Sequence, residues 1–201
     1  MKGRQREEAY RKVNPQMLLP ALMVDDGNVL FQSMAIMEYL DDVHPHPNLI
    51  PSEPLARARV RGLSGIVASD SHPLIVPRVR EFLEHDLKID EARRTKWIHH
   101  FLGAGMEALE TNLAGNQETG RYCQNDAITM ADICLVSHAV GCNFFKYDLS
   151  PYPTVRRIVE TWSSRGGVPA RLAAHLTRQA FAMLVELSEL AGPDGPLGFV
   201  H

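Results

Sequence analysis

The sequence predicts an α+β protein that begins with a short β-hairpin and continues as a long helical region. Three observations support this fold class. An apolar run at residues 18–24 is separated from a second run at 29–31 by the turn-forming residues Asp-Asp-Gly-Asn. Four prolines fall between residues 44 and 54. Beyond them, apolar residues recur at helical rather than strand spacing.

The first 43 residues contain the hairpin and two helical segments. The opening segment has helical composition but is short, because the residue before Pro15 disfavours the helical conformation. Ser33 is the expected N-cap of a helix that follows the hairpin and runs through Leu40. An isolated hairpin is marginal in water and the sequence offers no obvious further strand, so we expect it to need additional sheet.

The prolines at 44–54 form a stiff extended linker, and we place a domain boundary there. This gives an N-terminal domain of residues 1–43 and an all-helical domain of residues 55–201. Proline interrupts helices, so Pro73 and Pro77 should divide the first helical stretch. The helices expected in this domain cover residues 54–84, 91–113, 129 onward, 153–162 and 169–191, with a loop at 115–127.

Composition and charge argue against several classes of function. The formal net charge is −3, which does not favour nucleic acid or an anionic membrane as a partner. No apolar run approaches the roughly 18–20 residues of a membrane span, and residues 1–13 have no signal-peptide pattern. The cysteines, Cys123, Cys134 and Cys142, are odd in number, which favours a reducing cytosol over a disulfide framework. Cys134 and Cys142 fall in an apolar helical pattern and should be buried.

Neither metal nor phosphate chemistry is indicated by the sequence. His44 and His46 form one histidine pair, and His99 and His100 form another. Neither pair has a third ligand at zinc spacing, so we expect solvated histidines rather than a metal site. Residues 115–121 contain no phosphate-loop pattern.

Three local signals have both a structural and a functional interpretation. Thr129 and Asp132 fit a capping box, a folding device that any helix can use. Gln32 and Ser33 lie at a helix start, whose N–H groups suit a small carboxylate, although a plain N-cap serine is the more frequent case. Pro20 is either an ordinary edge-strand proline or a cis-proline that leaves the preceding backbone free for a ligand.

The order of these signals resembles the cytosolic glutathione transferases, and among them the zeta class of maleylacetoacetate and maleylpyruvate isomerases. The resemblance covers about residues 3 to 160 and implies a partial thioredoxin-like N-terminal domain followed by an all-α helical bundle. The matching segments are Asn14-Pro15 with Leu19-Pro20-Ala21-Leu22, Gln32-Ser33-Met34-Ala35-Ile36-Met37-Glu38-Tyr39-Leu40, Pro45-His46-Pro47-Asn48-Leu49-Ile50-Pro51, Ala56-Arg57-Ala58-Arg59-Val60-Arg61, Thr129-Met130-Ala131-Asp132-Ile133-Cys134-Leu135-Val136, and Phe145-Lys146-Tyr147-Asp148-Leu149-Ser150-Pro151-Tyr152-Pro153-Thr154.

The resemblance also implies roles for individual residues of the N-terminal domain. The glutamine and serine that match Gln32 and Ser33 bind the γ-glutamyl end of glutathione. The residue matching Leu19 pairs its backbone with the cysteinyl part, and Pro20 matches a cis-proline. Gln5 matches a polar position near the glycyl carboxylate.

In the helical domain, the resemblance implies a pocket for an acidic substrate. His72 matches a position that lines this pocket, and Arg78 matches an arginine that holds a substrate carboxylate, for which a planar guanidinium is suited. Phe144 stands where several zeta enzymes have an arginine, which weakens the expectation of a dicarboxylate. After Trp162 the usual family ending is absent, and residues 163–201 are predicted to form an unrelated apolar helix and a Gly/Pro tail.

No residue is assigned as the catalytic activator of the thiol. In the family, a strand, a helix and a strand precede the part that this sequence matches, with a Ser-Ser/Cys-x-x-x-Arg motif that stabilises the glutathione thiolate. The 201 residues contain no such motif, so we expect a chain that is N-terminally truncated relative to the family. The open hairpin edge would be completed by an upstream segment, paired with a partner chain, or packed on the helical domain.

Two functions are therefore considered. The first is a glutathione-dependent cis–trans isomerase or transferase of aromatic amino acid catabolism, acting on small acidic substrates such as maleylacetoacetate. Glutathione thiolate adds to the double bond, rotation follows, and the thiol leaves. The second is a non-catalytic binding or dimerisation module of the same family. In either case the family implies a cytoplasmic homodimer with glutathione as cofactor and neither nucleic acid nor membrane as partner.

Overall fold

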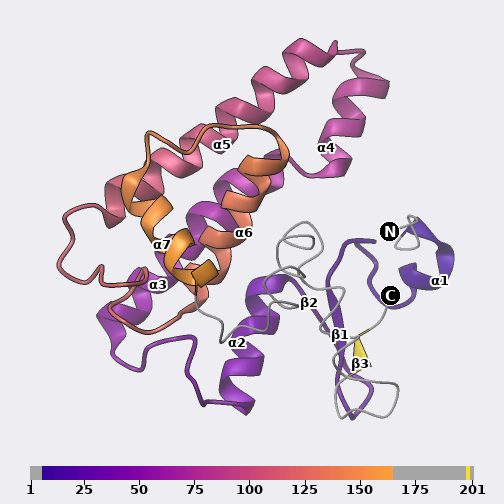
Figure 1. Ribbon diagram of the computed structural model, residues 1–201. Coiled ribbons are helices and arrows are strands. Elements are labelled where there is room, and N and C mark those ends of the chain that lie inside the picture. Colours follow the sequence, from indigo (N-terminus) through magenta and orange to yellow (C-terminus); the bar gives the residue numbers. More distant parts are fainter. Residues whose placement is uncertain (1–5, 165–197, 200–201) are drawn as a thin grey trace. The chain divides into compact units, whose positions relative to one another are not determined.

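The computed structural model describes residues 6–164 and 198–199, which fall into two compact units (Figure 1). The first unit contains the described residues up to Asn48 together with 198–199, and the second begins at Leu49. The helix predicted at 169–191 lies outside the described residues. None of the helices that the structure describes has the length and apolar character needed to cross a membrane.

Short strands and helices alternate in the first unit. α1 (Glu8–Arg11) is a single turn, and β1 (Ala21–Met23) and β2 (Val29–Phe31) pair antiparallel. α2 (Ser33–Val43) follows β2 without a loop. The predicted hairpin is confirmed, but its first strand is shorter than predicted, since Pro20 has no N–H to donate to a ladder.

The turn of the hairpin is stabilised by its own side chains. Asp26 accepts hydrogen bonds from the backbone amide and the side-chain amide of Asn28, at 3.0 and 2.6 Å. These bonds favour the carboxylate and hold the pKa of Asp26 below its ordinary value. Gly27 has φ of +81°, a conformation that glycine adopts without steric cost. Local sequence therefore determines this turn, as predicted.

A third strand corrects the expectation that the sequence holds no further strand for the hairpin. β3 (Gly198–Phe199) pairs antiparallel with β1, with Leu22 opposite Phe199. The strand order is β2-β1-β3, so β1 is the central strand of the sheet. Sequence reasoning missed β3 because a two-residue strand carries no alternation pattern to detect.

The second unit is built from helices packed around one apolar core (Figure 1). α3 packs on α6, and α5, the long pink helix in Figure 1, packs on α7. Buried residues from these helices, including Leu63, Leu102, Leu135 and Ile158, fill the space between them. The α-helices are α3 (Pro54–Gly65), α4 (Pro77–Glu81), α5 (Glu91–Leu113), α6 (Met130–Phe144) and α7 (Pro153–Ser164).

Prolines divide the first helical stretch as predicted. After α3 the chain widens into a π-helical segment, Ile66–Ser71, and then tightens into a 3-10 turn, His72–Leu74. Pro77 opens α4, which continues into a second π-helical segment, Phe82–Asp86. A proline lacks the N–H that would continue a helix but is tolerated in its first turn. The chain therefore changes helical type beside both Pro73 and Pro77.

The start of α7 is capped from another helix. Glu110, in α5, accepts hydrogen bonds from the backbone amides of Thr154 and Val155, at 3.0 and 2.9 Å. Its carboxylate satisfies two helix-start donors and interacts favourably with the positive end of the helix dipole. This contact fixes α7 on α5, and no local pattern in the sequence reveals it.

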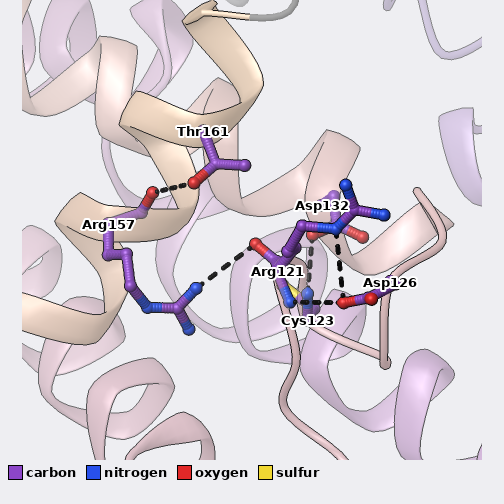
Figure 2. A network of polar contacts seen from close by, with 6 residues as sticks. All are labelled: Arg121, Cys123, Asp126, Asp132, Arg157 and Thr161. Carbon is purple, nitrogen blue, oxygen red and sulfur yellow. Dashed lines mark hydrogen bonds and ion pairs between the residues drawn. The ribbon is translucent and has the colours of Figure 1, made fainter.

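The loop before α6 is held by the buried carboxylate of Asp132. Its Oδ2 accepts from the amide and the hydroxyl of Thr129, at 2.8 and 2.9 Å, which confirms the predicted cap. Its Oδ1 accepts from the amide of Cys123 at 2.8 Å, as Figure 2 shows. In the same loop the amide of Arg121 donates to the exposed Asp126 at 3.0 Å. Asp132 therefore joins the loop to the helix in addition to capping it.

Candidate functional site

The residues predicted to bind an anion lie at the start of α2. Gln32, rather than Ser33, is the N-cap, since its φ of 69° and ψ of 121° are not helical while its carbonyl accepts from Ile36 at 3.0 Å. The prediction that Ser33 caps this helix was wrong, because Ser33 is already its first residue. The Ser33 hydroxyl is consequently not needed to close the helix start.

The backbone of Gln32 is unusual for a residue with a side chain. A φ of 69° lies in the left-handed region, which costs a non-glycine residue about 1–3 kcal/mol. The side-chain amide of Gln32 donates to Oε1 of Gln16 at 3.0 Å. Among the described residues, neither the amide nor the hydroxyl of Ser33 is engaged in a hydrogen bond. This sharp turn therefore presents donors at a helix N-terminus, an arrangement that suits an anion.

The Leu19–Pro20 peptide bond is cis, which selects one of the two alternatives left open by the sequence. The chain before it is held in place, because the carbonyl of Leu18 accepts from the Tyr10 hydroxyl at 3.0 Å and from the Asn14 side chain at 2.7 Å. The amide and carbonyl of Leu19 form no hydrogen bond with the residues that the structure describes. They can therefore pair with the backbone of a bound peptide.

The predicted substrate residues lie in the segment after α3. His72 is half-buried and opens the 3-10 turn, and burial lowers its pKa, so its imidazole is neutral near neutral pH. Arg78 is exposed on α4 and forms no ion pair with another described residue. Gln5 lies outside the described residues, so its role stays a prediction.

Next to His72 in the chain, a buried hydroxyl joins three helical segments. Ser71 donates to the carbonyl of Phe101 and contacts Nε2 of His138, each at 2.7 Å. A hydroxyl has one hydrogen, so His138 must donate from Nε2. Burial and the nearby charge of His72 lower the pKa of His138 to about 3, which keeps it neutral. A Cβ at Gly105 would lie 2.7 Å from the Ser71 oxygen, so this close approach requires glycine.

The end of α6 is aromatic but has a cation beside it. Phe144 is 66% exposed and packs edge-on against Phe145, with ring centroids 4.9 Å apart. The guanidinium of Arg80 lies 5.3 Å from the centroid of the Phe145 ring, and burial lowers the pKa of this arginine. His99 forms a hydrogen bond of 2.9 Å with the carbonyl of Phe145. α4 thus brings a positive charge to the helix end where residue 144 has none.

The cysteines are not candidates for nucleophilic chemistry. Cys123, Cys134 and Cys142 are buried and form no disulfide with one another, and burial raises the pKa of all three thiols, that of Cys134 to about 11 and that of Cys142 to about 12. A thiol reacts as its thiolate, so none of them is poised to react near neutral pH. Within the described part of the chain, no group of three metal-ligating side chains comes together.

Sequence reasoning did not single out the residues that support the site. Tyr10 and Asn14 act on the backbone of Leu18 through side-chain contacts that no local pattern encodes. His138 gave a detectable signal: it lies with Leu135 and Cys142 on the apolar face of α6, where an imidazole needs a buried partner.

Comparison with known proteins identifies the family. Residues 1–43 match the family model described as "Glutathione S-transferase, N-terminal domain". Among curated relatives, a maleylpyruvate isomerase of Ralstonia sp is 40% identical over 76% of this chain and 71% of its own length. A maleylacetoacetate isomerase of Pseudomonas aeruginosa is 38% identical over 88% of this chain and 80% of its own length.

Solved structures give the same result. A holo maleylpyruvate isomerase, described as a bacterial glutathione S-transferase of the zeta class, has a TM-score of 0.78 at 34% identity and covers 90% of this chain and 82% of its own. A maleylacetoacetate isomerase of Methylobacterium extorquens AM1, solved with malonate and glutathione, has a TM-score of 0.77 at 38% identity over 89% of this chain and 79% of its own. The chain therefore belongs to the zeta class of the glutathione transferases.

Proposed function

We propose that this protein binds glutathione and acts as a glutathione-dependent cis–trans isomerase or transferase on small acidic substrates such as maleylacetoacetate. In this reaction the glutathione thiolate adds to the substrate double bond, the resulting single bond rotates, and the thiolate leaves again. Because glutathione supplies the reacting thiolate, the protein must bind glutathione, favour its thiolate form and orient the acidic substrate.

The observation that carries the proposal is the geometry around Gln32 and Ser33. Gln32 has a positive φ directly before the helix, and the amide and hydroxyl of Ser33 at this helix N-terminus form no hydrogen bond with the other described residues. Donors of this kind bind a carboxylate, and glutathione has one on its γ-glutamyl residue. The backbone of Leu19, beside its cis-proline, is available for the cysteinyl part. A relative of this family was solved with glutathione bound, which supports the assignment.

The substrate side of the proposal rests on the helical unit. Arg78 supplies an exposed guanidinium for a substrate carboxylate, and a neutral His72 can donate or accept one hydrogen bond. The same relative holds malonate, a small dicarboxylate, as well as glutathione. We therefore assign an acidic substrate class to this chain, with Arg78 as its main charge partner.

A second candidate function is a non-catalytic module that binds glutathione or forms dimers without turnover. One observation favours it: none of the described residues is identified as an activator of the glutathione thiol. The buried cysteines have raised pKa values, and Ser33 is assigned to the opposite end of glutathione. Under this alternative, glutathione binds weakly and maleylacetoacetate is not isomerised.

The deciding experiment is an isomerisation assay on maleylacetoacetate with and without glutathione, beside a binding titration of glutathione. The enzyme proposal requires turnover that depends on glutathione and falls in Arg78→Leu through a higher KM for the substrate. The matched control is Arg61→Leu, which changes an exposed arginine on a different helix, α3. This variant should behave as the wild type. Binding of glutathione without any turnover would establish the second function instead.

The wider setting is part of the same proposal. We assign residues 1–43 to glutathione binding, 44–54 to a linker and 55–201 to the helical domain. We also propose a cytoplasmic homodimer that serves aromatic amino acid catabolism, with glutathione and a small acidic substrate as ligands. Light scattering that showed a strict monomer would refute the dimer and leave the glutathione site unaffected.

A further inference from the structure

Ser71 is the last residue of a π-helical segment, directly precedes His72 in the chain, and has a buried hydroxyl. The segment Ile66–Ser71 ends at Ser71, and His72 begins the 3-10 turn that follows. π-Helical turns occur mostly as short bulges within α-helices, frequently at functional sites. The direction in which His72 leaves the helix therefore depends on how Ser71 is held.

Ser71 is held from two other helices at once. Its hydroxyl donates to the carbonyl of Phe101 in α5 and accepts from Nε2 of His138 in α6, each at 2.7 Å. Ser71 is 2% exposed and His138 is 1% exposed, so water does not compete for these bonds. Gly105 allows the approach, because a Cβ there would lie 2.7 Å from the Ser71 oxygen and 3.0 Å from Nε2 of His138.

His138 and His72 are also coupled electrostatically, since a charge on His72 opposes a charge on His138. This coupling is smaller than the effect of burial on the pKa of His138, and His138 Nε2 forms its hydrogen bond with Ser71. The neutral His138 ring has one N–H, and it donates this N–H to the hydroxyl of Ser71 and not to His72. Its contact with His72 is thus indirect, through the residue that precedes His72 in the chain.

We propose that Ser71 and His138 are positioning residues: their hydrogen bond fixes the turn that presents the His72 imidazole to the substrate. The inference rests on the proposed function, because it assumes that His72 contacts the substrate. It adds that this contact is set by a buried pair which does not itself touch the substrate.

The test compares variants that break the pair with a matched control. Ser71→Ala removes the hydroxyl, Ser71→Cys replaces it with a nearly isosteric but weaker hydrogen-bonding group, and His138→Leu removes the donor. His138→Gln retains an N–H donor. The control is Ser64→Ala, an equally buried serine of α3 whose hydroxyl donates to the carbonyl of Val60 at 2.8 Å and also has the buried Cys134 thiol as a hydrogen-bond partner, so these hydrogen bonds involve neither Ser71 nor His138.

Two measurements are made on each folded variant: the pKa of His72 by NMR titration of its ring, and kcat and KM of glutathione-dependent isomerisation. In Ser71→Ala, Ser71→Cys and His138→Leu, a loosened turn admits water, so the pKa of His72 rises toward its ordinary value. Because misplacing a contact group by about 1 Å costs up to about a hundredfold, kcat falls about tenfold or more. The KM for glutathione stays unchanged. His138→Gln retains most of the wild-type behaviour.

The inference is overturned if Ser71→Ala, Ser71→Cys and His138→Leu all match Ser64→Ala in both the His72 titration and kcat. Should the wild type show no turnover, the proposed function fails, and the His72 titration alone then decides whether the pair positions the imidazole. Should Ser71→Ala fail to fold, Ser71→Cys and His138→Gln provide the comparison.

Discussion

Asp132 offers the sharpest test of how the helical unit is held together. Replacing it with asparagine keeps the shape of the side chain, so no cavity opens. The carboxylate accepts from Cys123 on Oδ1 and from the amide and hydroxyl of Thr129 on Oδ2, and it is fully buried. An amide has one acceptor oxygen, so in Asp132→Asn an NH₂ group must face a buried N–H donor.

The magnitude follows from this count. If the amide oxygen stays with Thr129, the Cys123 amide loses its partner, at a cost of about 1–3 kcal/mol for a buried unsatisfied donor. The two remaining bonds lose their charge assistance, at about 0.5 kcal/mol each. The free energy of unfolding should therefore fall by about 2–4 kcal/mol, which lowers Tm by about 5–15 °C for a protein of this size.

The assay is urea unfolding and thermal melting followed by far-UV circular dichroism. Asp126→Asn is the matched control, because Asp126 accepts from a backbone amide of the same loop but is exposed. It should lower the free energy of unfolding by less than about 1 kcal/mol. If the two variants lose equal stability, the buried carboxylate does not hold the loop to α6 and the reasoning fails.

Further predictions concern other buried groups. Glu110→Gln removes a charged cap from α7 and should cost about 1–2 kcal/mol in urea unfolding; an unchanged midpoint would contradict that role. The pKa of His138 is depressed in the folded state, so the unfolded chain binds the extra proton below about pH 6.5 and stability is lost as pH falls. His138→Gln should therefore reduce the stability lost between about pH 7 and pH 5 by about 2 kcal/mol, and an equal loss in both proteins would refute the assignment. Ellman's reagent should label the three cysteines only after unfolding, whereas rapid labelling of the native protein would mean that a thiol is accessible.

Local chemistry accounts for the elements that the sequence predicted well. Pro73 and Pro77 cannot continue a helix, and the chain changes helical type beside both. Gly27 and Asp26 build the hairpin turn from their own backbone and side-chain preferences. Thr129 and Asp132 lie three residues apart, so their pairing is visible in the sequence. These features need no knowledge of distant contacts.

Tertiary contacts decided what the sequence left open or hid. The cis peptide bond at Pro20 and the positive φ at Gln32 are backbone conformations. The same local sequence is compatible with other conformations at both positions, so the sequence alone did not predict them. Serine is a residue type that is common at N-caps, but the turn at Gln32 places Ser33 one residue inside the helix. Residues such as Glu110 and His138 act on partners more than 40 residues away, which no local pattern can indicate.

We propose that Gln32, Ser33 and Leu19 form the part of the site that recognises the γ-glutamyl and cysteinyl portions of glutathione. Isothermal titration of glutathione and of cysteinylglycine, which lacks the γ-glutamyl residue, tests it most directly in the wild type and in Ser33→Ala. We expect glutathione to bind the wild type at least about tenfold more tightly than cysteinylglycine, as a charge-assisted hydrogen bond implies. Ser33→Ala should reduce that difference severalfold, because it removes the hydroxyl and keeps the backbone amide. Equal affinities in the wild type, or an undiminished preference in Ser33→Ala, would contradict the claim.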